Sequence, residues 1–311
     1  MTLKTVFLGN PSFSLPVLEE LYQNDSIDLI AVYGSPDKPS GRGKKITSPP
    51  TITYAKKNNI KVFQQDSINK DDEFISFCDR EKPDLFIVLA FSHFLSEKIL
   101  SIPKSGCFNI HTSLLPKYRG SSPIHYALLN GDKTTGVSIQ KMVKKMDAGD
   151  IAHSIECLIE SDEDYLTLSD KLSTLSKKAI SEFIHLFKNN TIKYVKQNET
   201  NVTFAPLIKK VDGHITFRES ANEILNKIKA YKAWPGTYFS VDEKSYKFFD
   251  VEISEDINLP PGKIKITKTK LYIGTSDKTL SILSMQPPGK PLMKTASFIN
   301  GYKFQSQEVS S

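Results

Sequence analysis

One stretch decides how this chain folds: Cys107-Phe108-Asn109-Ile110-His111-Thr112-Ser113-Leu114-Leu115-Pro116-Lys117-Tyr118-Arg119-Gly120. It begins as a short apolar strand and becomes a loop at Ser113. Alternate residues of a strand point to the same face, so Asn109 and His111 are expected side by side where the strand ends. An amide can donate a hydrogen bond to a developing oxyanion, and an imidazole can move a proton near neutral pH. The pair is therefore a candidate catalytic site; the alternative is a polar strand end that only satisfies local backbone groups.

Apolar runs that alternate with helical segments precede and follow this strand. Such alternation is typical of an α/β protein with a doubly wound, Rossmann-like and mostly parallel sheet. Ligands bind such sheets beyond the carboxyl ends of the strands, which is where the Asn–His pair is expected. A long amphipathic pattern predicts one helix over Tyr165–Lys188. The strands are expected at 4–9, 28–33, 60–63, 84–90, 107–111, 135–142 and 151–159.

The last third of the chain has a different pattern. One helix is expected at about 221–233, and many short strands around it suggest a smaller, OB-like β-barrel. These strands are expected at 236–241, 245–253, 263–267, 270–274 and 279–285. The polar segment between the two patterns is expected to be a linker with little structure of its own. The predicted organisation is a catalytic domain at 1–188, a linker at 189–202 and a β-barrel domain at 203–311.

Composition limits the class of protein. With 311 residues, 39% hydrophobic and 24% charged, the chain is expected to be a globular protein of two domains. No apolar run approaches the roughly 20 residues of a membrane span, and the N-terminus lacks a signal-peptide pattern. Three widely spaced cysteines indicate a reducing cytoplasm, and neither they nor the histidines show metal-ligand spacing. Residues 201–311 hold 16 Lys/Arg against 11 Asp/Glu, which favours a polyanionic partner for this part.

The strand end and its loop, Asn-Ile-His followed by Ser-Leu-Leu-Pro-Lys-Tyr-Arg-Gly, resemble the signature of the folate-dependent formyltransferases. In that family the Asn and the His act with an Asp of an Asp-x-Gly turn, and Asp147 stands at that place. The residues alone leave Asp150 as an equal candidate, and the family match favours Asp147. The resemblance implies direct attack of a substrate amine on the formyl group of 10-formyltetrahydrofolate. Asn109 and His111 would bind the oxyanion, and Asp147 would orient the imidazole, with neither an enzyme nucleophile nor a metal.

The resemblance also implies where the folate lies. It would border the loop and the apolar strand end that precedes it, since planar pterins are usually held in apolar slots by backbone groups. The implied folate-binding residues are Ser113, Leu114, Leu115, Pro116, Leu89, Phe91 and Val143.

A second loop, residues 34–50, is unusually long and basic for a connection between a strand and a helix. Its Pro-Ser-Gly-Arg-Gly-Lys-Lys run looks like the inserted loop with which methionyl-tRNA formyltransferases hold the tRNA acceptor stem. The implied tRNA contacts are therefore Arg42, Lys44 and Lys45. The implied acceptor is initiator methionyl-tRNA, formylated for translation initiation by a cytoplasmic monomer.

Two alternatives stay open. A sugar-nucleotide N-formyltransferase would use the same three residues on a small acceptor, although the basic loop and the basic last third favour tRNA. A non-catalytic RNA-binding protein would keep the barrel without activity, although the catalytic residues are intact. The chain departs from the usual residues of the family at Asn10, Thr112 and Ala233, none of which is among those three.

Overall fold

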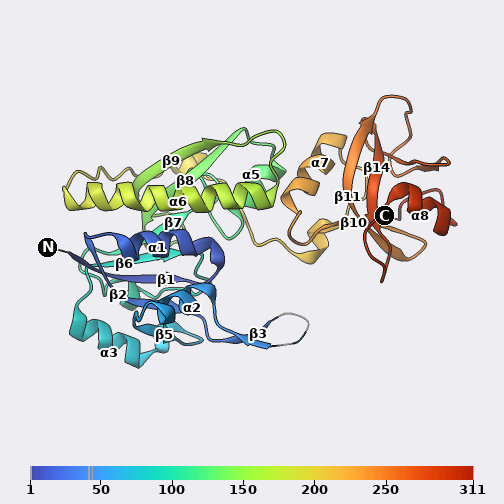
Figure 1. The fold of residues 1–311 in the computed structure, drawn as a ribbon. Helices are drawn as coiled ribbons and strands as arrows, with labels where there is room; N and C mark the ends of the chain where they lie inside the picture. Colours follow the sequence, from blue (N-terminus) through green and yellow to red (C-terminus); the bar gives the residue numbers. More distant parts are fainter. Residues whose placement is uncertain (1, 41–42, 44, 311) are drawn as a thin grey trace. The chain divides into compact units, whose positions relative to one another are not determined.

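The chain forms two compact units in the computed structural model, which describes residues 2–40, 43 and 45–310 (Figure 1). Unit 1 comprises Met1–Pro123, Thr134–Leu158 and Ser169–Phe204, and unit 2 comprises Ile124–Lys133, Ile159–Leu168 and Ala205–Ser311. Within the described residues, no helix is both long enough and apolar enough to cross a membrane.

Unit 1 is built on a seven-stranded sheet in the order β5-β2-β1-β6-β7-β8-β9. The first five strands of this order are parallel, and β8 and β9 are antiparallel to their neighbours. The predicted Rossmann-like, mostly parallel sheet is therefore confirmed. The strands are β1 (Leu3–Gly9), β2 (Ile27–Gly34), β5 (Val62–Gln64), β6 (Leu85–Leu89), β7 (Cys107–His111), β8 (Thr134–Lys141) and β9 (Ile151–Leu158).

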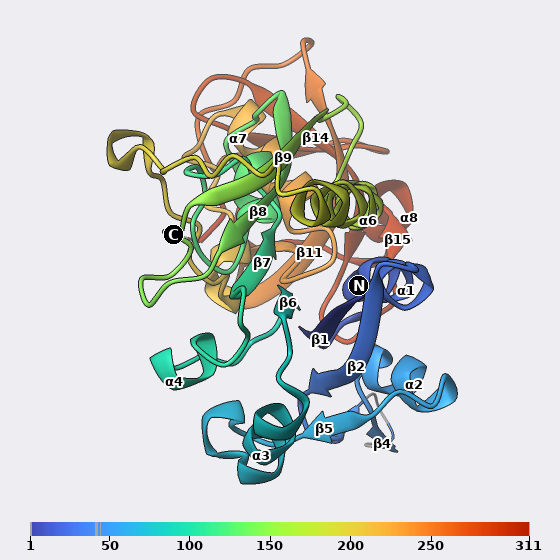
Figure 2. The same cartoon turned by 90° about the vertical axis from the view of Figure 1, so that its left-hand side faces the viewer.

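Helices cover both faces of this sheet, with α1, α2 and α6 on one face and α3 and α4 on the other (Figure 2). The helices of the first half and the long helix that follows β9 are α1 (Leu15–Gln23), α2 (Pro50–Lys57), α3 (Asp72–Glu81), α4 (Glu97–Leu100), α5 (Pro123–Leu129) and α6 (Tyr165–Lys188).

Strand β7 divides its side chains between these two faces. Phe108 packs on Phe183 of α6, with ring centroids 4.8 Å apart. Cys107 instead belongs to the core cluster that contains Phe74 and Phe77 of α3. Because side chains alternate along a strand, Asn109 shares the face of Cys107 and lies beyond the core, near the carboxyl edge of the sheet.

The basic loop at 34–50 contains a short hairpin that the sequence did not predict. Strand β3 (Lys38–Ser40) pairs antiparallel with β4 (Lys45–Thr47). Lys45 is exposed on this hairpin. Arg42 and Lys44, which were predicted to contact tRNA, lie outside the described residues.

Unit 2 contains a six-stranded antiparallel sheet, in the order β10-β11-β14-β13-β12 with β15 paired to β14. Its core includes Phe217, Phe239 and Phe248, whose ring centroids are 5.7 to 5.8 Å apart. This architecture agrees with the predicted OB-like class. The elements are α7 (Ala221–Ala230), β10 (Thr237–Val241), β11 (Lys244–Ser254), β12 (Ile264–Ile266), β13 (Leu271–Gly274), β14 (Thr279–Gln286), β15 (Met293–Lys294) and α8 (Thr295–Gly301).

Helix α7 ends earlier than the sequence predicted. It begins with a capping box, in which Ser220 and Glu223 bond to each other's backbone N–H, and it ends at Ala230 rather than near Ala233. A residue that precedes proline is disfavoured in helical conformation, which prevents a helix from continuing past Ala233, and the chain already turns from Tyr231 onward. The turn is closed by a 3.0 Å hydrogen bond from the Gly236 N–H to the Tyr231 carbonyl.

The segment expected to be a linker is held firmly to unit 1. It contains one short 3-10 helix, Glu199–Asn201, and its Val195 exchanges two backbone hydrogen bonds with Ile151. Gln197 is only 6% exposed. This glutamine serves buried polar groups of the unit.

Candidate active site at the carboxyl end of β7

The structure brings the three predicted catalytic side chains together. Asn109 and His111 come from the end of β7, and Asp147 comes from the loop between β8 and β9. The Asn109 amide donates to Asp147 Oδ1 at 3.4 Å, and His111 Nδ1 lies 3.8 Å from Asp147 Oδ2. Asp150, which the residues alone left as an alternative, is exposed on the surface.

The Asp147 carboxylate is oriented by two further donors. The Gly120 N–H donates to Oδ2 at 2.9 Å, and the Gln140 amide donates to Oδ1 at 2.8 Å. Only 13% of the Asp147 side chain is exposed. Hydrogen bonds from two fixed donors hold the carboxylate in one orientation. The Ser-Leu-Leu-Pro-Lys-Tyr-Arg-Gly loop thus contributes directly to the site through its final glycine.

The hydrogen bonds of His111 decide which of its nitrogens can exchange a proton. His111 is almost completely buried, and Nε2 lies 2.8 Å from the carbonyl oxygen of Tyr118. A carbonyl can only accept, so Nε2 carries a hydrogen, and Nδ1 is the nitrogen that faces Asp147. The family resemblance implied that His111 binds the oxyanion together with Asn109. With Nε2 already engaged, only Nδ1 is available for proton transfer.

Backbone conformation at the site is unusual at three non-glycine residues. Ala90 after β6, Tyr118 in the loop and Asp147 have φ angles of 50°, 61° and 49°. The left-handed region is costly for such residues, and clusters of them are typical of functional sites. Two residues beyond Asp147, Gly149 packs so tightly that an added Cβ would lie 1.6 Å from the Lys141 carbonyl oxygen. The Asp-x-Gly spacing is therefore a requirement of packing.

A buried polar network supports the Asp147 turn, and sequence reasoning missed it. Gln197 donates to the carbonyl oxygens of Asp147 and Gly149, at 2.9 Å and 2.7 Å. The oxygen of Gln197 accepts two hydrogen bonds from Arg119, from Nε at 3.0 Å and from Nη2 at 2.8 Å. Gln140 accepts from the Gly149 N–H at 3.1 Å. Only the position of Gln140 opposite Asn109 could have signalled a role, since nothing in segment 189–202 distinguishes Gln197.

The guanidinium of Arg119 extends this network to the surface. Arg119 is fully buried, and its other partner is Glu199, at 2.8 Å. Glu199 also accepts from Lys145 at 2.8 Å. Hydrogen bonds from Arg119 and Lys145 lower the pKa of the Glu199 carboxyl to about 2. The buried positive charge is thus compensated by a carboxylate at the surface.

The residues predicted to bind folate fall into two groups. The Ser113 hydroxyl is committed to the Lys117 carbonyl at 2.6 Å, and Leu89 and Leu115 are buried, so their side chains shape the loop and the sheet edge from within. The second group is accessible: Phe91, Leu114 and Pro116 are half-buried and Val143 is exposed. Two further apolar side chains are exposed in these loops: Phe94 in the loop of Phe91, and Met146 in the loop of Val143. Apolar surface with backbone polar groups beside it is what a planar pterin requires.

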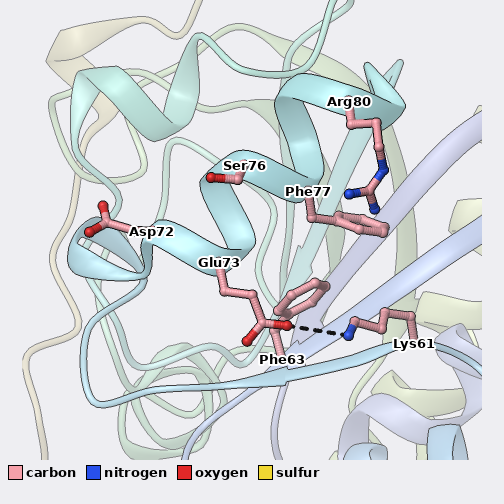
Figure 3. A pocket seen from close by; sticks show the side chains of 7 residues that line it. All are labelled: Lys61, Phe63, Asp72, Glu73, Ser76, Phe77 and Arg80. Atoms are coloured by element: carbon pink, nitrogen blue, oxygen red, sulfur yellow. Dashed lines mark hydrogen bonds and ion pairs between the residues drawn. The ribbon is translucent and has the colours of Figure 1, made fainter.

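A separate cavity of about 480 Å³ lies between β5 and α3 and contains none of the predicted site residues (Figure 3). Its Lys61 and Glu73 form an ion pair at 3.3 Å, so its charges compensate each other. Across the part of the chain that the structure describes, no cluster of three His, Cys, Asp or Glu residues could hold a metal ion.

Comparison with known proteins first defines the class. Residues 3–184 match the family Formyl transferase, and residues 207–303 match the family Formyl transferase, C-terminal domain. The protein is a formyl transferase by both halves. The methionyl-tRNA formyltransferase of Macrococcus caseolyticus is 38% identical over 97% of this chain and 96% of its own length, and that of Thermotoga maritima is 39% identical over 96% and 95%. The chain belongs to the methionyl-tRNA formyltransferase family.

Solved structures share the fold at lower identity. An N-formyltransferase of Helicobacter canadensis, in complex with folinic acid and dTDP-3-aminofucose, has a TM-score of 0.66 at 20% identity and covers 92% of this chain and 100% of its own. HypX of Aquifex aeolicus, in complex with tetrahydrofolic acid, has a TM-score of 0.62 at 17% identity and covers 98% and 49%. At these identities the likeness describes the fold alone.

Proposed function

We propose that this protein transfers the formyl group of 10-formyltetrahydrofolate to the α-amino group of methionine on initiator methionyl-tRNA. The observation that carries the proposal is the convergence of Asn109, His111 and Asp147 at the carboxyl end of β7. The names of the full-length relatives support the same acceptor.

Each of the three side chains has a distinct role in this reaction. The Asn109 amide donates to the formyl oxygen as negative charge develops on it during attack by the amine. His111 Nδ1 exchanges the proton that leaves the amine and must finally reach the departing folate nitrogen. Asp147 keeps the imidazole in place and stabilises it when it is protonated. Removing one oxyanion donor of this kind typically costs on the order of 100- to 1000-fold in rate.

We propose a division of labour between the parts of the chain. Residues 1–188 bind the folate and carry the chemistry, and residues 203–311 bind tRNA with the basic hairpin that contains Lys45. The exposed lysines of the β12–β13 hairpin, Lys265, Lys268 and Lys270, supply contacts to phosphates, which add affinity without sequence information. A tRNA substrate implies a cytoplasmic enzyme, and one chain holds all the parts, so we propose a monomer.

The test is formyl transfer from 10-formyltetrahydrofolate with charged initiator tRNA, and with an amino sugar nucleotide in parallel. Asp147→Asn should lower kcat on the tRNA by roughly 100-fold or more. Asp150→Asn is the matched control, because it alters an exposed carboxylate three residues away and should leave kcat within about twofold. Turnover of the sugar nucleotide alone would establish the alternative acceptor. Equal activity of both variants would show that Asp147 is not catalytic.

A further inference from the structure

Trp234 is the single tryptophan of the chain, and about half of it is exposed, at 49%. It lies in the turn between α7 and β10 of unit 2. One exposed aromatic side chain is ordinary by itself. The fixed backbone that carries this side chain and the positive charges around it indicate a binding role.

The turn that presents Trp234 is fixed from two sides. Besides the hydrogen bond that closes the turn, the His125 ring of α5 is hydrogen-bonded to the Trp234 backbone and lies 4.2 Å from the Tyr165 ring, centroid to centroid. On the other side Gly213 packs against the turn, where an added Cβ would lie 2.1 Å from the Gly236 carbonyl oxygen. An aromatic ring on a fixed backbone can bind a ligand with little loss of conformational entropy.

Positive charge surrounds this turn. Lys232 precedes Trp234 by two residues, and the Lys247 ammonium lies 4.0 Å from the position that a Cβ of Gly236 would take. Lys209 and Lys210 lead into Gly213, and all four lysines are exposed. Their ammonium groups form no ion pair with a carboxylate of the described residues. The nearby Asp212 carboxylate accepts instead from the Lys209 N–H at 2.7 Å.

A second aromatic group lies beside these lysines. Tyr238 of β10 is directly opposite Lys247 of β11, so the two side chains share the outer face of the sheet. The His214 ring is 5.2 Å from the Tyr238 ring, centroid to centroid. We call Trp234, Tyr238, His214, Lys232 and Lys247 the Trp234 patch.

We propose that the Trp234 patch binds single-stranded RNA, with an unpaired base stacked on the Trp234 indole and the flanking phosphates paired with Lys232 and Lys247. Aromatic rings interleaved with uncompensated lysines are the usual platform for unpaired nucleotides, and a duplex offers no free base face to stack. The inference rests on the proposed function in one respect: tRNA, whose 3′ end is unpaired, is the RNA that would supply these nucleotides. It assigns Trp234 a binding role separate from the catalytic residues of β7.

The test uses the fluorescence of this single tryptophan in the full-length protein. We expect a single-stranded RNA hexamer to quench Trp234 in a saturable, salt-sensitive manner, while the same sequence as a duplex quenches much less. Trp234→Ala should weaken binding of the labelled hexamer by roughly 5- to 150-fold, as expected for loss of one base–aromatic stack. Trp234→Phe should restore most of the affinity.

Leu292→Ala is the matched control, because Leu292 is an apolar residue of unit 2 that is 54% exposed and lies between Lys290 and Lys294. It should leave the affinity unchanged. The inference is overturned if the hexamer does not quench Trp234, if Leu292→Ala weakens binding as much as Trp234→Ala, or if an acidic peptide quenches as strongly as the hexamer. If the protein formylates charged initiator tRNA but RNA does not quench its Trp234 fluorescence, this inference is refuted and the proposed function stands. If single-stranded RNA quenches Trp234 specifically but no formyl transfer is detected, the proposed function is refuted and this inference stands.

Discussion

Replacing Gln197 tests whether the buried network beneath the Asp147 turn serves catalysis. The side chain makes four hydrogen bonds of 3.0 Å or less, two to the carbonyl oxygens of Asp147 and Gly149 and two from Arg119. Leucine is close in size and can make none of them. Gln197→Leu therefore leaves two buried carbonyl groups and one edge of a buried guanidinium without partners.

The size of the effect follows from these lost contacts. Each unpartnered buried polar group costs about 1–3 kcal/mol, and a lost hydrogen bond to a charged group costs about 1.5–3 kcal/mol. We expect the free energy of unfolding to fall by about 4 kcal/mol, which is less than the sum of these costs because the site can relax and Arg119 keeps its ion pair with Glu199. With its carbonyl released, the left-handed Asp147 turn should move, and a displacement of about 1 Å is sufficient to lower kcat roughly 100-fold.

Urea unfolding followed by circular dichroism measures the first effect, and formyl transfer at saturating substrates measures the second at a temperature where the variant is folded. Lys196→Leu is the control, because it places the same leucine side chain at the exposed neighbouring position and leaves Gln197, Arg119 and Glu199 unchanged. It should change stability much less and kcat not at all. A Gln197→Leu variant with wild-type stability and wild-type kcat would refute the proposed role of this network. A destabilised variant with wild-type kcat would show that the network supports the fold and not catalysis.

Three further predictions follow from packing and burial. Gly149→Ala should lower the free energy of unfolding by about 3 kcal/mol, because the added Cβ would clash with the Lys141 carbonyl oxygen. Gly301→Ala is the control and should be close to neutral, because no described atom lies within 4 Å of the added Cβ; urea titrations of both variants make the comparison. Burial lowers the pKa of His125 from 6.5 to about 4, so between these pH values the unfolded chain binds more protons than the folded one, and the free energy of unfolding should fall as the pH decreases from 6.5 to 4. His125→Phe should flatten this pH dependence, and an unchanged dependence would contradict its attribution to His125. Burial raises the pKa of the Cys78 and Cys107 thiols to about 12, so at pH 8 a thiol reagent should modify at most one of the three cysteines until urea exposes the others.

Local patterns were sufficient to predict the fold class. Apolar runs of strand length alternating with helical periodicity specify a parallel sheet, and alternation along 107–111 specifies that Asn109 and His111 share a face. The family match selected Asp147 over Asp150, although both carboxylates are equivalent in local sequence. Errors occurred where a turn or a packing contact overrides periodicity, as at the end of α7 and in the hairpin β3–β4.

The sequence by itself determined the order of strands and helices, the polar pair at the end of β7 and the basic character of the last third, because these depend on periodicity and charge. Only the tertiary structure decided which nitrogen of His111 faces Asp147, that Gly120 and Gln140 orient its carboxylate, and that Gln197 lies beneath the turn. The hydrogen bonds concerned connect residues that are 7 to 50 positions apart in the sequence. No local pattern encodes such contacts, because a buried glutamine and a solvated one have the same chemistry in the sequence and differ only in the groups that the fold places against them.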